Sequence, residues 1–366
     1  MTGRVALYNL TYDQLAELLA DWGEPRFRVD QVWGWLYKSL VSDFEGMANL
    51  PKALRAHLTS EADLGLLSIL SERESPSGQT RKVLYRLRDG NTIESVLMHY
   101  HDRRTACISS QVGCGMGCTF CATGQGGLVR NLSAGEIVAQ VIHLAREIRE
   151  AQIERAEEHG TRAPLPEHPV THIVLMGMGE PLANYDATWQ AIETLTDARG
   201  YRLGARHITL STVGLVPGIR RLTEEELPIN LAVSLHASDD SLRDQLVPVN
   251  LRYPLADVMA AARDYVQKTG RRLTIEYALI DGVNDTMEQA QGLADLLRDL
   301  LCHVNLIPLN PTPGSALQGS PRERVDAFRD LLEGRRIPTT VRMRRGIGIE
   351  AGCGQLRQRQ ADIVIG

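Results

Sequence analysis

Three closely spaced cysteines lie in one short loop, Gly113-Cys114-Gly115-Met116-Gly117-Cys118-Thr119-Phe120-Cys121-Ala122, with the spacing C-x3-C-x2-C. Iron in a cubane iron–sulfur cluster is usually held by four cysteines, so a set of three leaves one iron open to an outside ligand. Structural zinc is the alternative, but zinc sites usually draw four ligands from two separated pairs, and no second pair follows in this sequence. We predict that Cys114, Cys118 and Cys121 hold a [4Fe–4S] cluster.

The composition limits the class of protein. The chain has 366 residues, with 40 basic and 45 acidic side chains and a net charge of −5, so any nucleic-acid site must be local. The first residues lack the apolar core of a signal peptide, and no apolar run reaches the roughly 18 residues that span a bilayer. The six cysteines do not fit the disulfide framework of a small secreted domain. We expect a cytoplasmic protein without membrane contact, whose reduced thiols serve as ligands or catalysts.

Strand and helix patterns alternate around and after the cysteine loop. Six apolar, β-branched runs indicate strands at 106–110, 171–175, 207–210, 229–235, 273–280 and 304–308. Helical patterns lie between them, at 187–195, 255–266 and 287–301, which favours parallel βαβ units. Six units are too few for a closed eight-fold barrel. We therefore predict an α/β fold with a partial (β/α)6 barrel, whose active centre lies at the C-terminal ends of the strands.

The chain is expected to divide into four segments. Residues 1–64 form a small helical domain, in which Thr11 caps a first helix. Residues 65–100 form a β-hairpin linker around the turn Asp89-Gly90-Asn91. The barrel covers 101–345, and its charged stretch 146–166 is interpreted as a solvated helix end plus a loop. Residues 346–366 form a C-terminal segment that carries Cys353.

The cysteine spacing resembles that of radical S-adenosylmethionine (SAM) enzymes, in which the amino and carboxylate groups of SAM chelate the open iron. Four of the six predicted strands end in polar or glycine-rich clusters. Glycine lets the backbone approach a ligand closely, and Glu, Ser and Asn side chains bind its ammonium, hydroxyl and adenine groups. Such clusters are common at strand ends and a lone histidine is often a core residue, but together they favour a SAM pocket. The predicted pocket residues are Gly179, Glu180, Ser211, Ser234, Leu235, His236 and Asn310.

Four longer motifs carry a more specific resemblance. They are Phe27-Arg28-Val29-Asp30-Gln31-Val32-Trp33-Gly34-Trp35-Leu36-Tyr37, Cys107-Ile108-Ser109-Ser110-Gln111-Val112-Gly113-Cys114, Gly177-Met178-Gly179-Glu180-Pro181 and Cys353-Gly354-Gln355-Leu356. On these motifs the chain resembles the RlmN/Cfr family of radical-SAM adenosine methyltransferases over nearly its whole length. The RlmN type is favoured because it is the commoner member of that family.

The resemblance implies that an adenine ring carbon is methylated through a protein thiol. Cys353 would take a methyl group from one SAM, and a radical from a second SAM, cleaved at the cluster, would activate that methyl for addition to the base. Cys107 would release the product by forming a disulfide with Cys353, and Glu94 would accept the ring proton. The implied product is 2-methyladenosine, in 23S rRNA at the peptidyl-transferase centre and in tRNA beside the anticodon. A flavodoxin-like electron donor is implied as a further partner.

Alternatives remain for the activity and for single residues. Methylation at C8 of a 23S rRNA adenosine, the Cfr outcome that gives antibiotic resistance, uses the same chemistry. A non-catalytic metal-binding RNA-binding protein would use neither Cys107 nor Cys353. Cys107 and Cys302 also fit buried apolar positions, and Glu94 fits a solvent-facing strand position.

The segment around Cys353 is the predicted contact with RNA phosphates. It holds seven arginines against one acid between residues 335 and 359. It also departs from the family pattern Arg-Gly-x-Asp-Ile-x-Ala-Ala-Cys, because Gly348 replaces the acid and Gly352 an alanine, which adds backbone freedom around Cys353. Residues 1–64 resemble the accessory RNA-binding domain of the family, although we expect most of their aromatic side chains to form a small core.

Overall fold

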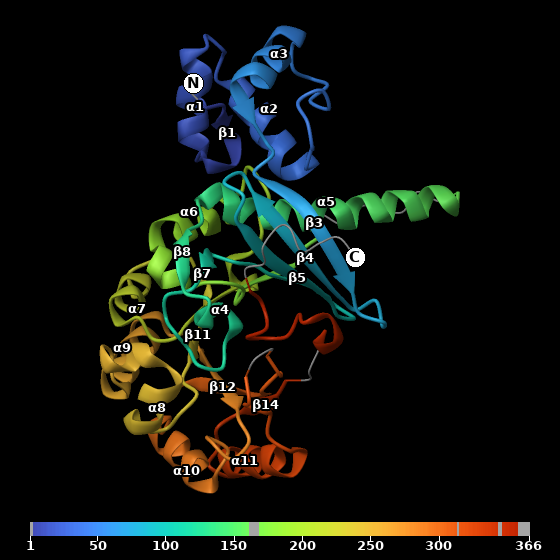
Figure 1. Cartoon of the computed structure of the whole chain (residues 1–366). Helices are drawn as coiled ribbons and strands as arrows, with labels where there is room; N and C mark the ends of the chain where they lie inside the picture. Colours follow the sequence, from blue (N-terminus) through green and yellow to red (C-terminus); the bar gives the residue numbers. More distant parts are fainter. Residues whose placement is uncertain (1–2, 161–167, 313–314, 343–345, 358–366) are drawn as a thin grey trace.

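A ten-stranded sheet forms the centre of the protein, whose computed structural model describes residues 3–160, 168–312, 315–342 and 346–357. The strand order is β14-β13-β12-β11-β10-β9-β6-β5-β4-β3 (Figure 1). The parallel strands are β6 (Arg104–Cys107), β9 (His172–Leu175), β10 (Ile208–Thr212), β11 (Asn230–Ser234), β12 (Leu273–Leu279), β13 (Cys302–Pro308) and β14 (Thr339–Val341). The first and last strands of this order are not neighbours, so the barrel is open, which confirms the predicted α/β partial-barrel fold.

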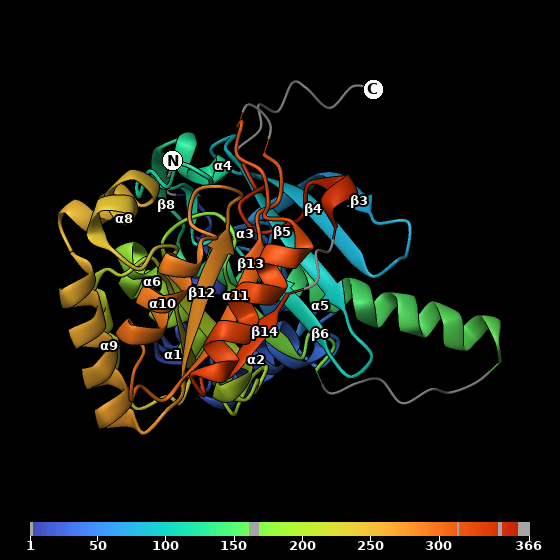
Figure 2. The same ribbon diagram turned by 90° about the horizontal axis from the view of Figure 1, so that it is seen from below.

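Helices connect the parallel strands and cover the outer face of the barrel (Figure 2). They are α6 (Tyr185–Thr196), α7 (Val216–Thr223), α8 (Asp240–Leu246), α9 (Leu255–Thr269), α10 (Met287–Leu296) and α11 (Arg322–Gly334). Each of the six predicted parallel strands is present, and the structure adds β14 as a seventh. Only three residues long, β14 gives no periodic signal in the sequence, and it is defined by its pairing with β13.

Three antiparallel strands extend the barrel sheet on one side. They are β3 (Leu67–Glu74), β4 (Thr80–Leu87) and β5 (Thr92–His99), and β5 pairs antiparallel with β6 through partners such as Val96 and Cys107. The predicted hairpin is therefore present, but it belongs to the barrel sheet instead of linking two separate parts. Residues 92–97 of β5 are all buried, because this strand is covered on both faces. The alternative in which Glu94 is a solvent-facing strand residue is excluded for this reason: its side chain is 1% exposed.

The N-terminal helices form a compact unit with its own aromatic core. Its elements are β1 (Val5–Ala6), α1 (Tyr12–Asp21), α2 (Phe27–Gly34), a π-helical turn (Trp35–Ser39), α3 (Lys52–Glu61) and β2 (Ala62–Asp63). Thr11 caps α1 in a capping box with Gln14, as predicted. Trp33 and Tyr37 are each 1% exposed, and the Trp33 ring packs edge-on against Tyr12 with 5.6 Å between centroids. These aromatic side chains stabilise the unit and are not available to stack on RNA bases.

One long helix, α5 (Ala134–Glu158), begins beneath the antiparallel strands and projects beyond the body of the protein (Figure 2). Its first half is buried and its end is half-buried or exposed, which fits the predicted solvated helix end; residues 161–167 of that stretch lie outside the described part. A small hairpin of β7 (Gln111–Gly113) and β8 (Leu128–Asn131) encloses the cysteine loop and α4 (Ala122–Gln125). Short 3-10 turns lie at Leu7–Asn9, Pro181–Asn184, Ala205–His207, Pro248–Leu251 and Ile347–Ile349. None of the helices in the described ranges has the length and apolar character needed to cross a bilayer.

Candidate active site

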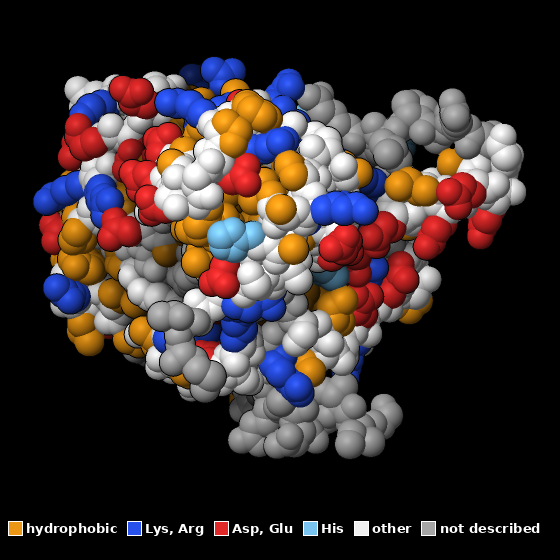
Figure 3. All heavy atoms as spheres, turned by 90° about the horizontal axis from the view of Figure 1, so that it is seen from above, with side chains coloured by type: hydrophobic (Ala, Val, Ile, Leu, Met, Phe, Trp, Pro, Cys, Tyr) orange, Lys and Arg blue, Asp and Glu red, His pale blue; other side chains and the backbone are white. Residues whose placement is uncertain are grey.

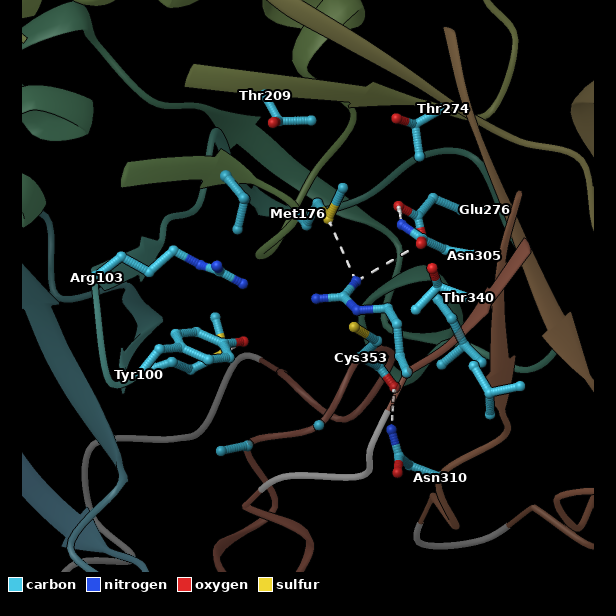
Figure 4. Close-up of a pocket in the computed structure, with 17 residues that line it drawn as sticks. Tyr100, Arg103, Met176, Thr209, Thr274, Glu276, Asn305, Asn310, Thr340 and Cys353 are labelled. Atoms are coloured by element: carbon cyan, nitrogen blue, oxygen red, sulfur yellow. Dashed lines mark hydrogen bonds and ion pairs between the residues drawn. The ribbon is translucent and has the colours of Figure 1, made fainter. Parts of the chain in front are cut away.

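Two adjoining cavities lie inside and above the open barrel. The smaller, of about 150 Å³, lies at the C-terminal ends of the parallel strands and is bounded by the cysteine loop. The larger, of about 440 Å³, extends into the barrel between inward-facing side chains (Figure 4). Both cavities are lined by the same six residues where they meet: Met176, Glu276, Ile307, Asn310, Arg342 and Cys353. A group at this boundary can therefore reach a ligand in either cavity.

The structure brings the three predicted cluster ligands together on one wall of the smaller cavity. Burial raises the pKa of the Cys114 thiol to about 12 and raises the pKa of Cys118 above its usual range, and the neighbouring cysteines add to both shifts. Without a metal these thiols are therefore protonated at neutral pH, and a bound metal centre would hold them as thiolates. The loop depends on Gly113, whose φ is +77° and where a Cβ atom would lie 2.0 Å from the Gly127 carbonyl oxygen.

The loop offers three cysteine thiols to one cavity, which is the ligand set of a cluster with one open iron. Among the residues that the structure describes, the one group of three His, Cys, Asp or Glu ligand atoms within 4.8 Å of each other is Glu72, His143 and Glu147. At least one pair of the three loop sulfurs therefore lies more than 4.8 Å apart. Three soft thiolate donors suit iron–sulfur ligation with one iron left open.

Six of the seven predicted SAM-pocket residues line the smaller cavity together. They are Gly179, Glu180, Ser211, Ser234, His236 and Asn310. Glu180 is buried, its carboxylate accepts hydrogen bonds from the backbone N–H groups of Leu182 and Val213, and burial raises its pKa to about 7. Leu235 does not line either cavity: its side chain is buried, its N–H donates to the Glu276 carbonyl, and its own carbonyl accepts from Arg243.

His236 presents a neutral ring to the smaller cavity. Its Nδ1 accepts a hydrogen bond from the Ala278 N–H at 2.9 Å, so the proton of the neutral ring is on Nε2. Burial lowers the pKa of His236 to about 3, and Phe120 packs edge-on against the ring with 4.8 Å between centroids. The backbone of His236 is left-handed, with φ of 62°. The side chain is therefore a fixed hydrogen-bond donor in this pocket.

The two predicted catalytic thiols are close to one another. Cys353 is exposed and lines both cavities, whereas Cys107 is buried at the end of β6, and both are free thiols. Burial, with the nearby Cys353 as the next cause, raises the pKa of Cys107 to about 12. The Cys353 sulfur is also the main cause that raises the pKa of Arg342. Arg342 and Cys353 are therefore neighbours where the two cavities meet.

Glu94 is not placed with these residues. It lines neither cavity, and its carboxylate lies 3.1 Å from the Lys82 ammonium and accepts a hydrogen bond from the Arg357 N–H. The structure therefore places the predicted proton acceptor behind the Cys353 loop, among groups that already bind it.

A polar group that the sequence did not predict lies on the floor of the larger cavity. Glu276 and Asn305 are register partners on β12 and β13, and the Asn305 amide donates to Glu276 Oε1 at 2.9 Å. Glu276 Oε2 has no hydrogen-bond partner among the described residues and lies 3.7 Å from an Arg342 nitrogen. Burial raises the pKa of this carboxyl group. The available signal was a single acid inside the otherwise apolar run of β12. Figure 4 shows both side chains directed into the cavity, with Thr274 and Thr340 beside them.

The predicted arginine cluster is only partly at the site. Arg342 lines both cavities, and Arg103 packs over the Tyr100 ring at 4.3 Å where the β5–β6 turn borders the larger cavity (Figure 4). Arg335 and Arg336 instead lie beside Cys302 at the opposite ends of the strands, because they precede β14. Arg344, Arg345 and Arg359 lie outside the described residues. Positive side chains also lie near one another on the face shown in Figure 3, interspersed with acids and apolar side chains.

The chain is similar to known proteins over nearly its whole length. Residues 5–64 match the family described as "Ribosomal RNA large subunit methyltransferase N-terminal domain", and residues 108–294 match the "Radical SAM superfamily". A "Probable dual-specificity RNA methyltransferase RlmN" from Chloroflexus aurantiacus is 52% identical over 361 residues, which cover 97% of this chain and 93% of that protein. The "Dual-specificity RNA methyltransferase RlmN 1" of Myxococcus xanthus is 48% identical over 351 residues, or 96% of this chain and 94% of that protein. The crystal structure of a radical SAM methyltransferase from Sphaerobacter thermophilus superposes with a TM-score of 0.89 at 52% identity, covering 96% of this chain and 99% of that one.

Proposed function

The chain belongs to the RlmN family of radical SAM RNA methyltransferases, and from this premise we propose that it methylates carbon 2 of adenosine in 23S rRNA and in tRNA. The observation that carries the proposal is the position of Cys353, where a cavity bounded by three cysteines meets the larger cavity inside the barrel. A thiol at this boundary can take a methyl group on one side and present it to a base on the other. The proposed sites are the peptidyl-transferase centre of the rRNA and the position beside the tRNA anticodon, and the proposed compartment is the cytoplasm.

The cofactors follow from the family and from the donor groups of the smaller cavity. Radical SAM proteins use a [4Fe–4S] cluster and SAM, and we propose Cys114, Cys118 and Cys121 as the cluster ligands. Glu180, Ser234 and the Nε2–H of His236 would bind polar groups of SAM. When bound, the cluster and SAM supply a hydrogen-abstracting organic radical, with a flavodoxin-like protein as the proposed source of the electron. Two SAM molecules per turnover are proposed, because one must also supply the methyl group that Cys353 takes.

The larger cavity is the proposed site of the target base. Enzymes that modify a base in structured nucleic acid extrude the nucleotide into a pocket and bind its edge and face. Glu276 Oε2 can accept a hydrogen bond from the exocyclic amino group of adenine, and Tyr100 offers an aromatic face at the border of the cavity. The N-terminal unit, proposed as residues 1–64, is the further RNA contact. Residues 101–345 are the proposed barrel domain, and residues 346–366 are the proposed C-terminal segment that carries Cys353.

Replacing Cys118 with alanine should remove the cluster. The variant loses one of three thiol ligands, so we expect anaerobically reconstituted protein to contain little iron and to form no 5′-deoxyadenosine from SAM. The measurements are iron content and the cluster absorbance. Cys302→Ala is the matched control, because Cys302 is also buried but lies away from both cavities. Full iron content in the Cys118 variant would show that this loop is not the ligand set.

Product identification tests the proposed activity. Reconstituted protein would be incubated with SAM, a reductant and either a 23S rRNA fragment or tRNA, and the digested nucleosides compared by mass spectrometry with authentic 2-methyladenosine and 8-methyladenosine. We expect 2-methyladenosine from both RNAs. The 8-methyl isomer would show the Cfr activity instead, and the absence of any methylated nucleoside or 5′-deoxyadenosine would support a non-catalytic RNA-binding protein.

A further inference from the structure

A buried ion pair lies beneath the segment that carries Cys353. Lys82 on β4 and Glu94 on β5 lie 3.1 Å apart, with side chains that are 3% and 1% exposed. Removing two charges from water costs several kcal/mol per ion, and their mutual attraction offsets this only when further hydrogen bonds satisfy both groups. The partners of this pair therefore indicate what the pair holds in place.

Both charged groups bind the backbone of the Cys353 segment. The Lys82 ammonium donates to the Glu350 carbonyl oxygen at 3.0 Å, three residues before Cys353. Glu94 Oε2 accepts from the Arg357 N–H at 3.1 Å, four residues after it. The two ends of the loop thus meet on one ion pair, although Lys82 and Glu94 are more than 250 residues away from it in the sequence.

The same strand also fixes the second thiol. Val96, two residues after Glu94 on β5, is the register partner of Cys107 on β6. The Glu94 carbonyl accepts a hydrogen bond from the Ser109 hydroxyl at 2.7 Å, so the backbone around Glu94 is tied to the segment that follows Cys107. The strand that binds the Cys353 loop through Glu94, β5, is therefore also the strand that pairs with β6 and its Cys107.

We propose that Lys82 and Glu94 are a positioning pair that holds the Cys353 loop so that its thiol stays within reach of Cys107. The inference rests on the proposed function, in which these two thiols exchange, and it assigns Lys82 a role that the family resemblance does not supply. It also gives Glu94 a role other than proton acceptor. One of its carboxylate oxygens binds Lys82, the other binds the Arg357 N–H, and Glu94 lines neither cavity.

The test measures disulfide formation between Cys107 and Cys353, which requires no methyl transfer. Reconstituted protein whose Cys353 mass shows a free thiol is treated anaerobically with oxidised glutathione, which is reduced to two glutathione molecules as the two thiols become a disulfide. The rate is followed by mass spectrometry of the linked peptides. The variant is Lys82→Met/Glu94→Met, since replacing a buried ion pair with apolar side chains of similar size is often neutral or stabilising.

We expect the double variant to form the disulfide at least about tenfold more slowly, because thiols held by a rigid frame have a much higher effective concentration than thiols on a free loop. Amide hydrogen exchange across residues 350–357 should rise in the same variant. Arg81→Met/Glu72→Met is the matched control, since this neighbouring ion pair of 3.6 Å also joins two strands but lies on β4 and β3. It should keep the wild-type rate.

The outcomes separate this proposal from the proposed function. A wild-type disulfide rate and unchanged exchange in the Lys82/Glu94 variant, with its melting temperature preserved, would overturn the positioning role and leave the proposed function intact. Absence of the disulfide in the wild-type protein would overturn both. Loss of methyl transfer with an unchanged disulfide rate would return Glu94 to the role of proton acceptor.

Discussion

Replacing Cys353 with serine should abolish RNA methylation while the cluster remains bound. Cys353 lies where the two cavities meet, so its sulfur is the one thiol outside the cysteine loop that faces both the SAM side and the base side. A serine hydroxyl is a weak nucleophile without an adjacent general base, whereas a cysteine thiolate is a strong one. We expect turnover to fall by about 10⁴-fold or more, as when other enzymes lose a covalent nucleophile.

Two measurements give this prediction its controls. The wild-type protein should carry a methyl group on the peptide that contains Cys353 after incubation with SAM, and the serine variant should carry none. Iron content and SAM binding should be unchanged, because the smaller cavity keeps its other lining residues. Cys302→Ser, at the far ends of the strands, should retain activity. Normal turnover by the Cys353 variant would exclude a methyl-cysteine intermediate.

The strands that the sequence predicted best are those with a strong local signal. Runs such as 229–235 and 273–280 are apolar, β-branched and flanked by helical patterns, and each became a parallel strand. Strand β14 escaped because three residues show no periodicity, and its position depends on pairing with β13. The hairpin was predicted from its turn. That its strand β5 pairs with β6 of the barrel sheet was not predicted, because the sequence of neither strand indicates which strand it will pair with.

The site residues that could be predicted are likewise those with a local sequence signal. The cysteine loop and the strand-end clusters are local motifs, and the structure gathers all of them except Leu235 around one cavity. Lys82 and Glu276 were not recognised as site residues, because their partners Glu350 and Arg342 are far away in the sequence. Glu94 shows what a family resemblance cannot predict. The resemblance implied that Glu94 accepts a proton, but its burial and its ion pair with Lys82 appear only in the folded protein.

Replacing Cys107 with alanine should trap a covalent complex between the protein and its RNA. In the proposed sequence the methyl carbon joins adenine while still bonded to the Cys353 sulfur. Release requires the Cys107 thiolate to attack that sulfur: the new S–S bond forms, the bond from sulfur to carbon breaks, and its electron pair takes a proton to complete the methyl group. Without Cys107 the adduct has no resolving partner.

Only Cys107 is placed to release the RNA in this way. Cys353 is one cause that raises the pKa of the Cys107 thiol, so the two thiols are neighbours, whereas Cys302 lies at the opposite ends of the strands. We expect a complex that survives denaturing electrophoresis and disappears in Cys107→Ala/Cys353→Ala, with less than one methylated nucleoside released per protein. Repeated turnover by Cys107→Ala would show that another group releases the RNA. Because burial raises the pKa of Cys107 to about 12, its attack requires a proton to leave first, so release in the wild-type protein should become faster as the pH rises from 7 to 9.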